Sequence, residues 1–112
     1  MDPNENPKNR SQEKIKVKVD PEFEDLIPVF MANRRRDITL MMEALKDKNF
    51  ELIQRLGHGM KGAGSGYGMD QVTEIGKALE EAAKERNSSS IENWIEELSF
   101  YIEHIEVIYE QR

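Results

Sequence analysis

The stretch Leu56-Gly57-His58-Gly59-Met60-Lys61-Gly62-Ala63-Gly64-Ser65-Gly66-Tyr67-Gly68 decides how the rest of this sequence is interpreted. It holds six of the seven glycines and one of the two histidines of the chain. It contains no acidic residue, although the net charge of the chain is −6. Amphipathic patterns typical of helices lie on both sides of it. We therefore interpret the remainder as a helical scaffold that presents His58 to a partner.

The side chain of His58 is predicted to point into solvent. At about 100° per residue of helix, His58 lies about 160° from Met60 and about 140° from Ile53, which both belong to the apolar stripe. Lys61 follows three residues later and lies on the same face as His58, one turn along the helix. The exposed face is therefore expected to carry one imidazole with one cation beside it.

The glycines around His58 lower the stability of the helix, because each glycine in a helix costs about 1 kcal/mol relative to alanine. Some other gain should offset this loss. Gly59 and Gly62 would clear the approach of a docking partner to the imidazole. Gly57 and Gly64, on the inward side, would allow close packing between helices. A flexible loop in which His58 has no role is the alternative interpretation of the same residues.

Composition narrows the possible functions. The 112 residues suffice for one domain, and the absence of cysteine excludes disulfides and thiolate chemistry. With only two histidines in the chain, we expect no metal site. The acidic balance argues against nucleic acid as a partner. Between Leu52 and Met69 the only charges are Arg55 and Lys61, which predicts a locally positive window that favours an anion.

We expect residues 1–19 to form a disordered or extended tail and residues 20–112 to form the domain. The first part of this tail lacks the apolar residues that would offset the entropy of ordering. Ile15-Lys16-Val17-Lys18-Val19 alternates as a strand does, but no partner strand is evident, so we expect it to pack loosely on the domain. No secretory signal and no run of about 18 apolar residues is found, which predicts a cytoplasmic protein without membrane contact. We also expect a monomer.

The apolar periodicity predicts an all-α fold: an antiparallel up-down four-helix bundle with a short extra N-terminal helix. Asp20-Pro21 would start the short helix, which runs to about Leu26, and Pro28 either kinks it or begins the next helix. The last helix has apolar residues at heptad positions through Tyr109. The expected helices of the bundle run from Pro28 to about Lys46, from Phe50 towards Tyr67, from an N-cap at Asp70 through Ala82, and from Ile91 through Tyr109.

Gly57-His58-Gly59-Met60-Lys61-Gly62 also matches the G-x-G-x-x-G pattern of dinucleotide-binding proteins. That motif requires a strand before it and a helix after it. An amphipathic helix precedes it here, so a nucleotide-binding enzyme is a weak alternative.

The chain resembles the histidine phosphotransfer (HPt) family, whose motif is H-x-x-K-G followed by a glycine ten residues after the histidine. His58, Lys61, Gly62 and Gly68 occupy these places, and the resemblance covers roughly residues 20–112. Gly59, Gly64 and Gly66 depart from the family pattern, because larger residues are common there.

The resemblance implies that His58 accepts a phosphoryl group through Nε2 from an aspartyl phosphate and passes it on, without kinase activity of the chain itself. Lys61 would stabilise the phosphoryl charge, and Gly59 and Gly62 would face the docked partner. The implied partners are response-regulator receiver domains and a hybrid histidine kinase that carries one. Magnesium would come from the receiver, so no cofactor of this chain is expected.

Three further groups of residues bear on the site. Gln54, one turn before His58, could hydrogen-bond either Nδ1 of His58 or the phosphate. The run Arg34-Arg35-Arg36 is either a solvated helix face or part of an anion or docking site. His104 lacks a lysine and a glycine at the motif spacing, so we interpret it as a helix-surface residue. A helical adaptor that binds a signalling partner without phosphotransfer is the alternative function.

Overall fold

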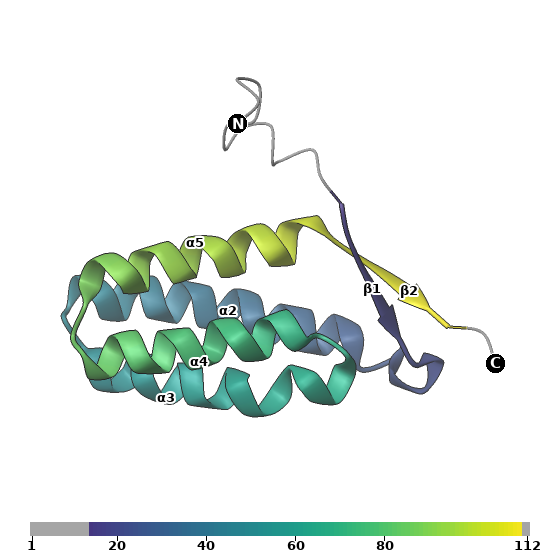
Figure 1. Ribbon diagram of the computed structural model, residues 1–112, viewed down its shortest axis with the longest axis horizontal. Coiled ribbons are helices and arrows are strands. Elements are labelled where there is room, and N and C mark those ends of the chain that lie inside the picture. The colour runs from purple at the N-terminus through teal and green to yellow at the C-terminus, as the bar shows by residue number, and fades with distance from the viewer. Residues whose placement is uncertain (1–13, 111–112) are drawn as a thin grey trace, which may run out of the picture.

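Four antiparallel helices form the body of the molecule in the computed structural model, which describes residues 14–110 (Figure 1). The predicted all-α bundle is confirmed. The helices are α2 (Ile27–Lys46), α3 (Phe50–Ala63), α4 (Asp70–Lys84) and α5 (Ser88–His104). Short 3-10 helices, η1 (Pro21–Phe23) and η2 (Ser65–Tyr67), precede α2 and follow α3.

Each helix contributes its apolar stripe to one shared core. Met41 of α2, Ile53 of α3, Leu79 of α4 and Leu98 of α5 are fully buried. Burial of such side chains contributes about 1.5–3 kcal/mol each, so this core dominates the stability of the bundle. The helices α3 and α4 pack against each other most closely, and this pair positions the site described below.

Side chains at the connections set where the helices begin. The Asn49 side chain accepts a hydrogen bond from the Leu52 amide, and the Asn87 side chain accepts one from the Ser90 amide. Each of these side chains bonds an N–H group of the first helical turn, which has no hydrogen-bond partner inside the helix. Asp20 caps η1 in the same way, as its sequence predicts. The expected short N-terminal helix is thus a single 3-10 turn, and Pro28 lies in the first turn of α2.

Two strands flank the helices, and one of our expectations about them is wrong. β1 (Ile15–Val19) pairs in parallel with β2 (Ile105–Tyr109), with Val19 opposite Tyr109. The segment that we expected to lack a partner strand therefore has one. Residues 1–13 of the predicted tail lie outside the described residues.

The partner was missed because the last helix ends earlier than its heptad pattern predicts. Backbone ψ is 135° at Ile105, which places this residue in the extended region and ends α5 at His104. Ile105 and Tyr109 are four residues apart, a spacing that fits one face of a helix and one face of a strand equally well. The β-branched residues between them favour the strand.

The position of the glycine pattern and the character of the helices both bear on function. The G-x-G-x-x-G pattern lies inside α3 and does not follow a strand, which removes the dinucleotide-binding alternative. Among residues 14–110 no helix has the length and apolar character needed to cross a membrane.

Candidate functional site

His58 projects from the middle of α3 on the side that borders α4. Its side chain is 69 % exposed, whereas Met60 and Ile53 of the same helix are fully buried. The predicted division of α3 into a buried stripe and a solvent-facing imidazole is therefore confirmed. Lys61 lies one turn further along and is about half as exposed as the imidazole, at 40 %.

A carboxylate from α4 links these two side chains. One oxygen of Glu80, Oε2, lies 3.0 Å from Nδ1 of His58. The other oxygen, Oε1, accepts a hydrogen bond of 3.1 Å from Nζ of Lys61. Glu80 is not among the residues that the sequence singles out, and its negative charge lies in the surroundings of His58 that we expected to be positive.

Glu80 is a buried carboxylate, with only 9 % of its side chain exposed. Burial of a charge is unfavourable unless the charge is paired and hydrogen-bonded. The hydrogen bond from Lys61 is the main reason that the pKa of Glu80 lies below its ordinary value, and the contact with His58 lowers it further. Burial acts in the opposite direction but does not prevail. Glu80 is therefore ionised at neutral pH.

The ionised carboxylate determines the state of the imidazole. A carboxylate only accepts hydrogen bonds, so Nδ1 of His58 must carry the hydrogen that it donates to Glu80. In the neutral imidazole the other nitrogen, Nε2, then has a free lone pair. The side chain is exposed, and Nε2 is the ring nitrogen left for a reaction with a group on another molecule.

Glycines allow α3 and α4 to approach closely enough for this contact. A Cβ atom on Gly57 would lie 2.8 Å from the backbone nitrogen of Glu80 and 2.8 Å from the carbonyl oxygen of Gly76. A Cβ atom on Gly76 would lie 2.7 Å from the carbonyl oxygen of Gly57. No side chain fits between these backbones, which confirms the inward packing role expected for Gly57. Gly64 similarly abuts Thr73 of α4.

The outer glycines have the opposite surroundings. Apart from its chain neighbours and the backbone of α3 itself, a Cβ atom on Gly59 or on Gly62 would meet no atom of the described residues within 4 Å. The surface beside the imidazole is therefore open, as the sequence predicts. Beyond η2, Gly68 adopts φ 78°, a left-handed conformation that ends the glycine stretch in a turn before α4.

The other residues singled out from the sequence lie apart from this network. We considered a hydrogen bond from Gln54 either to Nδ1 of His58 or to the phosphate. Glu80 occupies the Nδ1 position, so the contact between Gln54 and a phosphate is the part that stays a prediction. Arg34 bonds Asp37 within α2 and lies over the Phe30 ring. Nδ1 of His104 lies 2.7 Å from the carbonyl oxygen of Phe100 at the end of α5.

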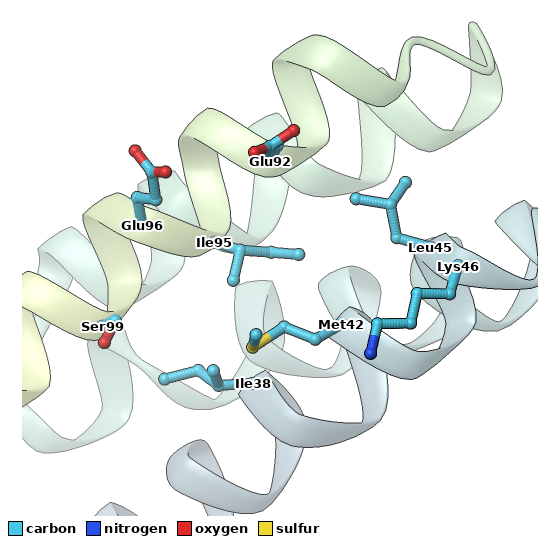
Figure 2. A pocket seen from close by; sticks show the side chains of 8 residues that line it. All are labelled: Ile38, Met42, Leu45, Lys46, Glu92, Ile95, Glu96 and Ser99. Atoms are coloured by element: carbon cyan, nitrogen blue, oxygen red, sulfur yellow. The ribbon is translucent and has the colours of Figure 1, made fainter.

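A groove of about 450 Å³ between α2 and α5 is distinct from this site. Figure 2 shows Ile38, Met42 and Ile95 projecting into it, with Glu92 and Glu96 at its rim. No residue of α3 or α4 lines the groove, so it does not contribute to the surroundings of His58. Within the described part of the chain, no cluster of three or more His, Asp or Glu side chains could hold a metal ion.

Comparison with known families agrees with this geometry. The family model described as Hpt domain matches residues 25–107, and the chain therefore belongs to the Hpt domain family. Hpt domains serve histidine phosphotransfer in phosphorelays, as intermediates and not as kinases, and they interact with receiver domains. No curated protein and no solved structure matches the chain.

Proposed function

We propose that this chain relays a phosphoryl group between receiver domains through Nε2 of His58. The observation that carries the proposal is the contact of 3.0 Å between Nδ1 of His58 and the buried carboxylate of Glu80. This contact leaves Nε2 as the nucleophile of an imidazole that is accessible to a partner.

In the proposed transfer, Nε2 attacks the phosphorus atom of an aspartyl phosphate on the receiver. The new bond joins Nε2 to phosphorus, and the bond between phosphorus and the aspartyl oxygen breaks, which returns a free carboxylate to the receiver. The reverse reaction passes the group to the aspartate of a second receiver. Phosphoryl transfer needs mainly in-line positioning and stabilisation of charge, which a rigid helical surface can provide.

Glu80 would assist by stabilising positive charge on the ring. Attack through Nε2 gives the imidazole cationic character while Nδ1 keeps its hydrogen. The carboxylate beside Nδ1 opposes this charge and fixes the orientation of the ring, as the buried aspartate does in a Ser-His-Asp triad. Because Glu80 is already ionised and bonded before the partner arrives, no rearrangement is needed during the transfer.

Lys61 would act on the phosphoryl oxygens. Its ammonium group has three donors, of which Glu80 accepts one in the structure. The remaining donors can bind oxygens of the group on Nε2, one turn away on the same face of α3. Gly59 and Gly62 would form the surface on which the receiver docks. Magnesium for the transfer would be held by the receiver, and we assign no metal to this chain.

Labelling by a purified phosphorylated receiver tests the proposal. The wild-type chain should acquire an acid-labile phosphate, whereas His58→Gln should acquire none. His104→Gln is the matched control, since it removes the other histidine and should be labelled like the wild type. Binding of the receiver without labelling of any variant would favour the helical adaptor and overturn the relay.

A further inference from the structure

The parallel pair of β1 and β2 extends away from one end of the bundle (Figure 1). The sheet has only these two strands within residues 14–110. A two-stranded sheet is marginally stable by itself, and backbone groups along its edges can pair with another strand. The turn at Gly68 lies against the outer edge of β1, since a Cβ atom on Gly68 would be 3.0 Å from the carbonyl oxygen of Lys18. The outer edge of β2 is therefore the place where another strand can add.

The direction of the backbone groups in β2 follows from one hydrogen bond and the register of the two strands. The Glu110 amide donates to the carbonyl oxygen of Val19, whose partner in the register is Tyr109. In a parallel ladder alternate residues direct their N–H and C=O groups to the same neighbour. Residues 106, 108 and 110 thus face β1, whereas Val107 and Tyr109 direct both groups, and Ile105 its C=O, to the open edge.

This open edge is complementary to itself. If two copies of β2 run antiparallel with Val107 opposite Val107, the two valines exchange two hydrogen bonds. The Tyr109 N–H of each copy then meets the Ile105 C=O of the other. A two-fold axis at Val107 therefore brings these outward-facing N–H groups of each copy opposite C=O groups of the other.

Charge distinguishes the two edges of the sheet. The corresponding antiparallel pairing of two β1 strands about Val17 would place Lys16 opposite Lys18 of the second copy, and like charges in that position destabilise pairing. Pairing of β2 places Glu106 opposite Ile108 of the second copy, without a repulsive pair. Ile108 is one of the few large apolar residues with a solvent-exposed side chain, at 37 % exposure. Lysines protect the edge of β1, whereas β2 carries no lysine.

We propose that this chain forms a two-fold dimer through antiparallel pairing of β2 with β2 of a second copy. The result is a four-stranded sheet in the order β1-β2-β2-β1. Its apolar face, formed by Ile105, Val107 and Tyr109 of each copy, continues across the axis. The monomer that we expected from the sequence was inferred without knowledge of β2. The proposal does not depend on phosphotransfer, because the contacts of His58 involve α3 and α4 alone.

The mass of the 112-residue chain in solution, measured by light scattering across a concentration series, tests the proposal. The wild type should reach twice the mass of one chain. Val107→Pro removes an N–H that faces the open edge and is not used by β1, so it should give a monomer. Lys16→Pro is the matched control, because it removes an outward N–H from the edge of β1 and should leave the dimer intact.

A charge exchange makes the test independent of proline. Ile108→Glu places a carboxylate opposite Glu106 of the second copy and should weaken the dimer at least tenfold. Adding Glu106→Lys restores an attractive pair and should recover the dimer. A wild type that stays monomeric at all concentrations would overturn the proposal, and so would a Val107→Pro variant that dimerises like the wild type. Circular dichroism of each variant checks that the helices are retained.

Discussion

Nδ1 of His58 lies 3.0 Å from Oε2 of Glu80, although 22 residues separate the two in sequence. This contact joins the exposed face of α3 to a buried carboxylate on α4. Because Glu80 also accepts a hydrogen bond from Lys61, one carboxylate holds both side chains on the exposed face of α3.

Replacement of the Glu80 carboxylate should slow phosphotransfer while His58 stays in place. In Glu80→Gln the charge that opposes the imidazolium is lost. The amide oxygen must face the donor Lys61, so the NH2 group faces Nδ1 and disfavours a hydrogen there. We expect the rate of transfer to fall by at least about 10- to 100-fold, the loss seen when a residue that orients a metal-bound histidine is replaced. Nitrogen NMR should show a smaller fraction of the Nδ1–H tautomer.

Glu81→Gln is the control for that variant. Glu81 follows Glu80 directly and pairs with Lys84 on the exposed face of α4. Its replacement changes the net charge by the same amount without touching His58. Equal transfer rates in the two variants would contradict the role given to Glu80.

The glycines of α3 should respond to alanine with opposite signs. Gly57→Ala forces a Cβ atom against the backbone of α4 and should lower the free energy of unfolding by about 1–3 kcal/mol. Gly59→Ala meets open space and should raise it by about 1 kcal/mol, because alanine favours the helix. Denaturant unfolding measures both changes. Equal changes in the free energy of unfolding for the two variants would show that Gly57 is not needed for the close approach of α3 and α4.

A long side chain on the open surface should impair docking without affecting the fold. Gly62→Gln places an amide one turn above His58, where the receiver must approach. Gly66→Gln adds the same side chain in η2, where the surroundings are equally open. We expect weaker receiver binding and slower transfer for Gly62→Gln but not for Gly66→Gln. The unfolding midpoints of the two variants should be the same. Wild-type binding by Gly62→Gln would place the docking surface elsewhere.

The stability of the bundle should fall at acid pH in a way that depends on Lys61. The pKa of Glu80 is lowered in the folded state from its ordinary value of 4.5. Its contribution to stability is therefore complete above that value and is lost as the pH falls through the lower folded-state pKa. The hydrogen bond from Lys61 is the largest cause of the lowering, so Lys61→Ala should lose less stability over this pH range than the wild type.

Chemical unfolding at a series of pH values measures that difference. Lys77→Ala removes an exposed lysine of α4 and serves as the control, with an acid dependence like that of the wild type. Identical pH profiles for Lys61→Ala and the wild type would mean that the contact between Lys61 and Glu80 does not stabilise the carboxylate in solution.

Local periodicity was enough to predict the bundle and the placement of His58. The angle between His58 and the stripe of Ile53 and Met60 is a property of one helix, so the exposed imidazole could be derived without tertiary structure. The same holds for the inward position of Gly57. Glu80 could not be derived in this way, because its contact with His58 depends on how α4 lies against α3. Its position next to the buried Leu79 was the only available signal.

The C-terminal strand was missed for a different reason. Ile105 and Tyr109 satisfy the periods of a helix and of a strand together, and the choice between them rests on pairing with β1 at the other end of the sequence. Pairing between distant segments is not encoded in either segment alone. The expectation that Ile15–Val19 had no partner followed directly from this error.

Identification of the atom that receives phosphorus tests the central claim most directly. The chain is phosphorylated by a receiver, the modified residue is located by mass spectrometry, and the ring nitrogen is assigned by nitrogen and phosphorus NMR. The account predicts one phosphate, on Nε2 of His58, with the hydrogen on Nδ1 retained. Phosphate on Nδ1 of His58, on His104, or on His58→Gln at the wild-type level would contradict it.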